Sequence, residues 1–207
     1  MYARTTTLTG DSGAIDAGIA HVRDEIMPAL DGIEGYQGLS MLVDRDTGRC
    51  ILTTAWDSPE ALAASAGRAS ALRSRAAEIF GAGPVEVEEW EIAVLHRAHH
   101  SPEGACARVT WVSADPGSAE PAIQSYKSTT LPAVEQLDGF LGASLLLNRA
   151  TGRAVSTVTF ESHDAMQRTR SRSDAVRARG AAEAAAQVLD VAELDLVLAH
   201  LHVPELV

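Results

Sequence analysis

Two arginines stand where a positive charge could bind a ligand. Arg73 falls near the middle of the apolar face of an Ala-rich segment with helical spacing, and Arg177 repeats that placement later in the chain. A guanidinium on an apolar face is costly unless it is paired. The pattern predicts either a site for an anionic or phenolic molecule, a structural ion pair with Glu89 or Glu193, or a side chain that snorkels at the helix edge.

Two histidines end the last apolar segment of each half of the chain. His96 and His200 are in phase with the apolar positions, where histidine can act as an acid–base group near neutral pH. A partly buried histidine with a backbone partner would give the same pattern. His200 and His202 alternate onto one strand face, but no third ligand follows at a telling spacing, so we expect no metal site.

Trp56 and Tyr126 are the aromatic residues that we assign to a candidate pocket. Large aromatic side chains can line a site for an aromatic substrate, although core packing is their commoner role. Tyr126 occupies the inward helix position that Val22 holds in the first half of the chain. No catalytic residue is assigned. The predicted substrate-binding set is Arg73, Arg177, His96, His200, Trp56 and Tyr126.

A repeat runs through the whole chain without a gap. The segment IEGYQGLS at 33–40 reappears as LDGFLGAS at 137–144, and the same shift carries Arg4 to Arg108. A polar stretch that contains proline and glycine joins the two copies. The predicted organisation is a first module over 1–97, a linker over 98–105 and a second module over 106–207.

Each copy shows the order strand, helix, strand, strand, helix, strand, which is the ferredoxin-like plan. In that plan both helices cover one face of the sheet, yet Leu141–Leu147 places apolar side chains on both faces of its strand. Leaving apolar surface in water costs roughly 25 cal/mol per Å². We therefore predict an α+β fold in which two tandem ferredoxin-like βαββαβ modules pack sheet to sheet as a pseudo-dimeric α/β barrel.

The bulk composition narrows the classes of partner. The net charge of −11 disfavours nucleic acid as a partner, since an acidic surface repels phosphate. No apolar run is long enough to span a membrane, and the first residues lack the pattern of a secretion signal. Two cysteines are too few for a disulfide framework. These features lead us to expect a cytoplasmic protein.

One set of motifs resembles a known family. The run Gly-(Tyr/Phe)-x-Gly is followed by an apolar strand, a glycine hairpin and a strand that ends at Trp56 or Phe160. The segments 57–61 (DSPEA) and 161–165 (ESHDA) come next. This resembles the antibiotic-biosynthesis-monooxygenase-like (ABM) dimeric α/β barrels.

The resemblance implies a cofactor-independent monooxygenase-like protein that acts on a small aromatic or polyketide-like substrate. The alternative is a non-catalytic binder of a small aromatic or anionic ligand. The resemblance also allows two copies of the chain to form a homodimer, in addition to the pseudo-dimer within one chain. The haem-degrading branch uses an Asn, a Trp and a His, and both copies lack all three at the matching positions. Haem degradation is therefore disfavoured. Those positions hold Arg4, Ser65 and Ser74 in the first copy and Arg108, Thr169 and Ala178 in the second.

Overall fold

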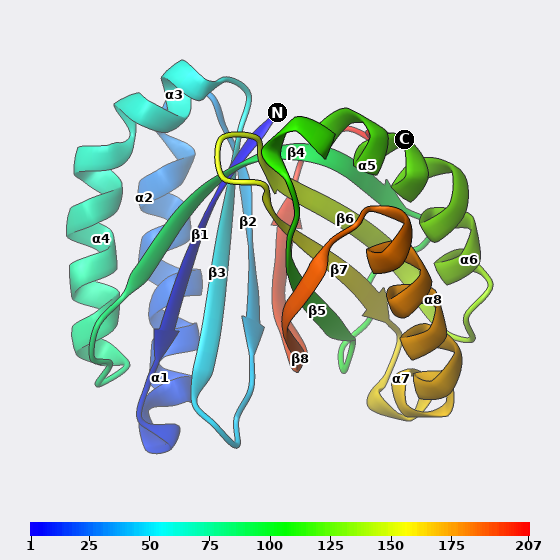
Figure 1. The fold of residues 1–207 in the computed structure, drawn as a ribbon. Coiled ribbons are helices and arrows are strands. Elements are labelled where there is room, and N and C mark those ends of the chain that lie inside the picture. The colour runs from blue at the N-terminus through cyan, green and yellow to red at the C-terminus, as the bar shows by residue number, and fades with distance from the viewer. The chain divides into compact units, whose positions relative to one another are not determined.

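A computed structural model describes residues 1–207 and shows the same order of elements twice (Figure 1). The strands are β1 (Tyr2–Thr9), β2 (Tyr36–Val43), β3 (Arg49–Trp56), β4 (Glu86–Arg97), β5 (Cys106–Ser113), β6 (Phe140–Asn148), β7 (Arg153–Phe160) and β8 (Gln187–Leu201). The helices are α1 (Ile15–His21), α2 (Met27–Asp31), α3 (Pro59–Ala64), α4 (Ala66–Ile79), α5 (Ala119–Ser125), α6 (Leu131–Glu135), α7 (His163–Arg168) and α8 (Arg170–Glu183).

The chain divides into two compact units. Unit 1 comprises residues 1–90 and 196–203, and unit 2 comprises residues 91–195 and 204–207. Strand β4 therefore begins in unit 1 and ends in unit 2, whereas β8 begins in unit 2 and ends in unit 1. The predicted modules and the linker over 98–105 describe the sequence repeat, and they stay a prediction. The compact units have other bounds, because β4 and β8 each lie partly in one unit and partly in the other.

The strands of each unit pair antiparallel. In unit 1, β3 lies between β1 and β2. In unit 2, β7 lies between β5 and β6, while β5 also pairs with β8 and β6 with β4. Hydrogen bonding links all eight strands in the order β1-β3-β2-β8-β5-β7-β6-β4, a closed barrel. The predicted α+β class and barrel of strands are confirmed.

Local sequence signals explain where several elements begin. The Oγ atoms of Ser58 and Ser162 each accept a hydrogen bond, at 3.2 Å, from the backbone N–H of the residue three positions later, so each serine caps the start of a helix. Gly38 has φ +109°, and a Cβ at this position would overlap the main-chain carbonyl of His200. Only glycine permits both the backbone conformation and that close approach.

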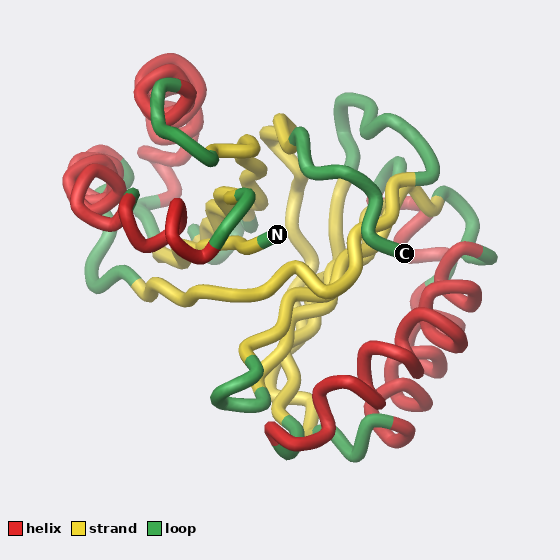
Figure 2. The backbone as a smooth tube through the Cα atoms, turned by 90° about the horizontal axis from the view of Figure 1, so that it is seen from above, coloured by secondary structure: helices red, strands yellow, loops and turns green.

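The first helical segment of each unit is not a regular α-helix. A π-helical turn, η2 (Val22–Ile26), separates α1 from α2, and its repeat, η4 (Tyr126–Thr130), separates α5 from α6. Pro28 and Pro132 lie just after these turns, and proline lacks the N–H that a regular helix needs. Figure 2 views the two helical segments of unit 1 nearly end-on, side by side.

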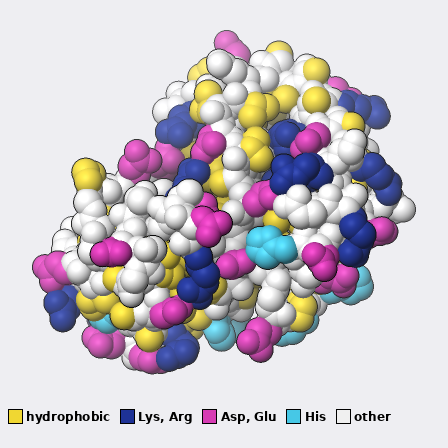
Figure 3. Space-filling model, turned by 90° about the horizontal axis from the view of Figure 1, so that it is seen from below, with side chains coloured by type: hydrophobic (Ala, Val, Ile, Leu, Met, Phe, Trp, Pro, Cys, Tyr) yellow, Lys and Arg dark blue, Asp and Glu magenta, His cyan; other side chains and the backbone are white.

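Each unit buries its own apolar core between helices and strands. The unit 1 core centres on residues such as Ile15, Leu39 and Phe80, and the unit 2 core on residues such as Leu145, Phe160 and Met166. No helix is long and apolar enough to cross a membrane. On the face shown in Figure 3, acidic and basic side chains are interspersed.

Candidate functional site: two unequal cavities

Each unit has a cavity between its helices and its strands, at equivalent positions of the repeat. The cavity of unit 1 has a volume of about 40 Å³ and that of unit 2 about 120 Å³. An apolar cavity of about 150 Å³ in another protein is large enough to hold benzene, and a single water needs about 10–15 Å³. Unit 2 thus approaches the size of one aromatic ring, whereas unit 1 has room for a few waters.

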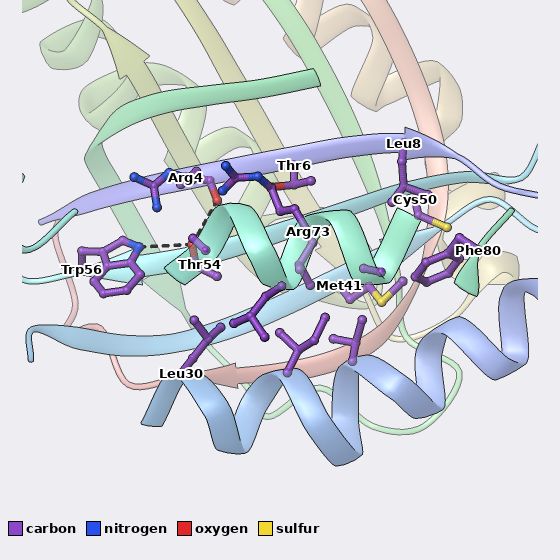
Figure 4. Close-up of a pocket in the computed structure, with 16 residues that line it drawn as sticks. Arg4, Thr6, Leu8, Leu30, Met41, Cys50, Thr54, Trp56, Arg73 and Phe80 are labelled. Carbon is purple, nitrogen blue, oxygen red and sulfur yellow. Dashed lines mark hydrogen bonds between the residues drawn. The ribbon is translucent and has the colours of Figure 1, made fainter. Parts of the chain in front are cut away.

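One large side chain accounts for much of this difference. Phe80, 1% exposed, fills one end of the unit 1 cavity (Figure 4). Its ring lies against Gly18, where a Cβ would overlap the ring carbons. The repeat has Ala184 and Ala122 at these two positions, and both line the unit 2 cavity. Exchanging a phenyl ring for a methyl group leaves the end of the second cavity open.

A buried arginine on the first strand faces the cavity of unit 1. Arg4 is 3% exposed and uses all three of its guanidinium nitrogens. Nε and Nη2 donate to Glu89 Oε1 at 3.0 and 2.7 Å, and Nη2 also donates to the Leu62 carbonyl at 2.7 Å. Nη1 donates to Ser65 Oγ at 2.8 Å. This guanidinium is satisfied by the protein alone.

The equivalent arginine of unit 2 is not satisfied in the same way. Arg108 is also 3% exposed, and its Nε and Nη2 donate to Glu193 Oε1 at 3.0 and 2.7 Å. Its contact with the Met166 carbonyl is longer, at 3.3 Å. Nη1 is buried and has no hydrogen-bond partner. Arg108 lines the larger cavity with one donor nitrogen unused.

Glu193 is held by more than Arg108. Its second carboxylate oxygen accepts hydrogen bonds from Gln167 and Arg170, both at 2.8 Å. Burial alone would raise the pKa of Glu193, but the hydrogen bond and charge of Arg108, with smaller effects from Gln167 and Arg170, bring it below its usual value. The carboxylate is therefore ionised near neutral pH, and it holds the Arg108 guanidinium in place.

The two arginines predicted from the helix pattern both line cavities. Arg73 lines the unit 1 cavity with its Nη1 buried and unpaired. Burial lowers the pKa of Arg73, and the nearby charge of Arg4 lowers it further, against an opposing effect of Glu89. Arg177 lines the unit 2 cavity, and its Nη2 donates to Asp174 Oδ1 at 2.9 Å. Glu89 and Glu193 form their ion pairs with the strand arginines, and Glu193 with Arg170 as well.

Tyr126 brings a polar group to the wall of the unit 2 cavity. Its hydroxyl lies 3.1 Å from Ser156 Oγ and donates to the Ser144 carbonyl at 3.4 Å. Burial raises the pKa of Tyr126 to about 12, so the hydroxyl stays protonated near neutral pH. Unit 1 has Val22 and Leu52 at the positions of Tyr126 and Ser156, so this polar pair belongs to unit 2 alone.

Trp56, the other aromatic residue predicted for the site, lines the cavity of unit 1 rather than that of unit 2. It is fully buried, lines the cavity of unit 1 and donates its indole N–H to Thr54 Oγ1 at 3.1 Å (Figure 4). Its ring packs edge-on against Tyr36, with 5.6 Å between the ring centroids. Both contacts are internal to the protein, so Trp56 serves mainly to build the wall.

The two predicted histidines lie outside both cavities. The ring nitrogens of His96 lie 2.8 Å from Glu135 and 3.1 Å from Glu205, and the ring stacks on Phe140. The side chain of His200 is exposed. No group of three or more His, Cys, Asp or Glu side chains is arranged to hold a metal ion.

The buried strand arginines, Arg4 and Arg108, were not among the predicted site residues. A sequence signal for them existed, because both are charged residues in short β-rich segments and both recur at the same place of the repeat. Their partners Glu89 and Glu193 also recur, but each lies 85 residues further along the chain. No local pattern joins residues so far apart.

Comparisons with known proteins agree with this architecture. The chain is 54% identical to the Mycobacterium tuberculosis protein named "Uncharacterized protein Rv2557", over 100% of this chain and 92% of the relative. The crystal structure of a "putative monooxygenase" from Lactobacillus acidophilus is similar, with a TM-score of 0.69, 12% identity and coverage of 97% of this chain and 96% of that one.

The crystal structure of an anthrone oxidase-like protein is similar as well, with a TM-score of 0.64, 16% identity and coverage of 94% and 90%. At such low identity the two structures establish the fold, and they confirm the ABM-like barrel that the motifs predicted. No protein-family model matches the chain.

Proposed function

The chain belongs to the family of the Mycobacterium tuberculosis protein Rv2557, and from its unequal cavities we propose that it binds a small aromatic compound in unit 2. The observation that carries this proposal is the difference in volume, about 120 Å³ against about 40 Å³. The first volume approaches what a ligand of one ring needs, and the second is far below it.

The lining of the unit 2 cavity suits such a ligand. Most of it is apolar, and a few polar groups stand among the apolar side chains, which is the usual composition of a small-molecule site. The polar groups include Arg108, Thr110, Tyr126 and Ser156. The apolar lining includes Val112, Ala119, Ile123, Leu145, Leu147 and Val158.

Calorimetric titration with phenol, a neutral single ring at pH 7, tests this proposal. We expect saturable binding to the unaltered chain, and a loss of at least 100-fold in affinity in the Ala184→Phe variant because the new ring fills the open end of the cavity. Ala178→Phe is the matched control, since Ala178 is an exposed residue of α8 that lines no cavity. Equal binding in both variants would contradict the proposed location.

A second candidate is oxidation of the bound ring by molecular oxygen without a cofactor. The observation that favours it is the unused donor of Arg108, because a cation beside a phenol lowers its pKa and favours the electron-rich phenolate. Oxygen would then be the oxidant: a phenol and one O₂ give a quinone and one water. The new carbonyl oxygen comes from O₂, and the water takes up one hydrogen from the ring carbon that is oxidised and one from the phenol hydroxyl.

Oxygen consumption distinguishes oxidation from binding alone. If the chain oxidises the ring, an aerobic mixture with a panel of one-ring and fused-ring phenols should consume one O₂ for each quinone formed, and Ala184→Phe should abolish that consumption. Binding of phenol with no oxygen uptake across the panel would leave the binding function and remove the monooxygenase candidate.

A further inference from the structure

The unpaired Nη1 of Arg108 indicates that the ligand of unit 2 carries a negative charge. A buried donor that finds no acceptor costs about 1–3 kcal/mol, more for a charged group, so such groups in folded proteins usually have a partner. Arg108 Nη1 is buried, unpartnered and part of a side chain that lines a cavity of ring size. The partner that suits a guanidinium is an anionic oxygen.

One substitution within the repeat explains why this nitrogen is free. In unit 1, Ser65 Oγ accepts from Arg4 Nη1 at 2.8 Å and donates to the Leu62 carbonyl at 2.7 Å. Unit 2 has Thr169 at this position. The Thr169 hydroxyl donates to the carbonyls of Ala165 and Met166, at 3.0 and 3.1 Å, and accepts no hydrogen bond from Arg108 Nη1.

The charged side chains around Arg108 carry one positive charge that no carboxylate among them neutralises. Arg108 and Arg170 share the single carboxylate of Glu193, and Arg177 is paired with Asp174. These five side chains carry one positive charge more than negative. The one carboxylate that lines the cavity, Asp115, lies beyond the far end of β5, where its Oδ1 accepts a hydrogen bond from Gly117 N at 2.7 Å. An anion beside Arg108 therefore meets a net positive surrounding.

The strand geometry sets the length of the ligand. Arg108 and Thr110 point to the same face of β5, and residues two apart on a strand are separated by roughly 7 Å. Thr110 is paired across the sheet with Ser156, which contacts the Tyr126 hydroxyl at 3.1 Å. The strand positions that carry Arg108 and this polar group are thus separated by about the length of one substituted ring.

We propose that the ligand of unit 2 is a small aromatic carboxylate, whose carboxylate accepts a hydrogen bond from Arg108 Nη1 and whose opposite end carries a hydroxyl group near Ser156 and Tyr126. This inference rests on the proposed binding function of unit 2. It adds the charge and the orientation of the ligand, which a neutral phenol does not test.

The experiment compares benzoate with benzamide, its neutral counterpart of the same shape, by calorimetric titration at pH 7. We expect benzoate to bind at least tenfold more tightly than benzamide, and 4-hydroxybenzoate more tightly than benzoate. The Thr169→Ser variant should weaken benzoate at least fivefold and change benzamide less than twofold, because the introduced serine can accept from Arg108 Nη1 as Ser65 does from Arg4. Ser65→Thr in unit 1 is the matched control and should change neither affinity.

Arg108→Lys provides a second variant in case the introduced serine does not adopt the geometry of Ser65. Lysine keeps the charge that pairs with Glu193 but lacks a second donor nitrogen, so benzoate should weaken at least tenfold and benzamide less than twofold. The inference would be overturned if benzoate and benzamide bound with equal affinity, or if these variants lost both ligands alike. In either case, saturable binding of phenol would still support the proposed function. Failure of phenol, benzamide and benzoate alike would overturn both.

Discussion

Units 1 and 2 are built from one repeated sequence, yet one uses its space for packing and the other leaves space for a ligand. Unit 1 closes its cavity with Phe80 and satisfies its strand arginine with Ser65. Unit 2 has Ala184 and Thr169 at those positions, a larger cavity and an unpaired Arg108 nitrogen. A few substitutions within one repeat therefore separate a filled core from a candidate site.

The largest expected effect comes from removing the ring that fills unit 1. Phe80→Ala should lower the free energy of unfolding by about 3–5 kcal/mol, because the lost ring leaves a cavity in a packed core. Ala184→Gly in unit 2 should cost about 1 kcal/mol or less. Urea unfolding of the two variants measures the contrast. A cost under about 1 kcal/mol for Phe80→Ala would show that the ring is not a packed part of unit 1.

A smaller effect is expected at alkaline pH from the buried Tyr126 of unit 2. Because the pKa of Tyr126 is raised to about 12 from an ordinary value of 10, its neutral form stabilises the fold. That contribution, about 2 to 3 kcal/mol, is complete below pH 10 and is lost as the pH rises towards 12. Between pH 9 and pH 11 the unaltered chain should lose about 1 kcal/mol more than Tyr126→Phe.

Urea unfolding at several pH values from 9 to 11 checks this difference. Val22→Tyr, at the equivalent place of unit 1, is unsuitable as a control because the unit 1 cavity has no room for the ring. Tyr2→Phe on β1 is the better control, since Tyr2 is only partly buried. Parallel curves for the unaltered chain and Tyr126→Phe would show that the tyrosine is not buried in unit 2.

The smallest effect concerns the two hydroxyls beside the strand arginines. Ser65→Ala should cost about 1–3 kcal/mol because Arg4 Nη1 loses its acceptor while staying buried. Thr169→Val keeps the side-chain shape and removes a hydroxyl that serves only helix carbonyls, so it should cost about 1 kcal/mol or less. Thermal unfolding of both variants measures the difference. A larger cost for Thr169→Val would mean that Thr169 supports Arg108 after all.

Much of the fold could be predicted from the sequence because its signals are local. The order of elements followed from hydrophobic spacing and from the glycines at the turns. The helix pattern also singled out Arg73 and Arg177, which line the cavities of units 1 and 2. The π-helical turns were not predicted, because the same apolar spacing fits a regular helix with a proline near its end.

The remainder of the site depends on contacts between distant residues. The pairing of Arg108 with Glu193 joins two strands, and the effect of Phe80 depends on its position against Gly18. The aligned repeat shows phenylalanine opposite alanine at 80 and 184, but sequence alone gives no volume to that difference. His96 was in phase with apolar residues, yet its ring lies between two carboxylates outside either cavity.

The most direct test of the contrast between the units is a crystal structure of the chain soaked with 4-hydroxybenzoate. We predict one bound molecule in the unit 2 cavity, with its carboxylate within hydrogen-bond distance of Arg108 Nη1 and its hydroxyl group towards Tyr126 and Ser156, and no molecule in the unit 1 cavity. A ligand seated beside Arg73 in unit 1, or a unit 2 cavity that stays empty at saturating ligand, would contradict this prediction.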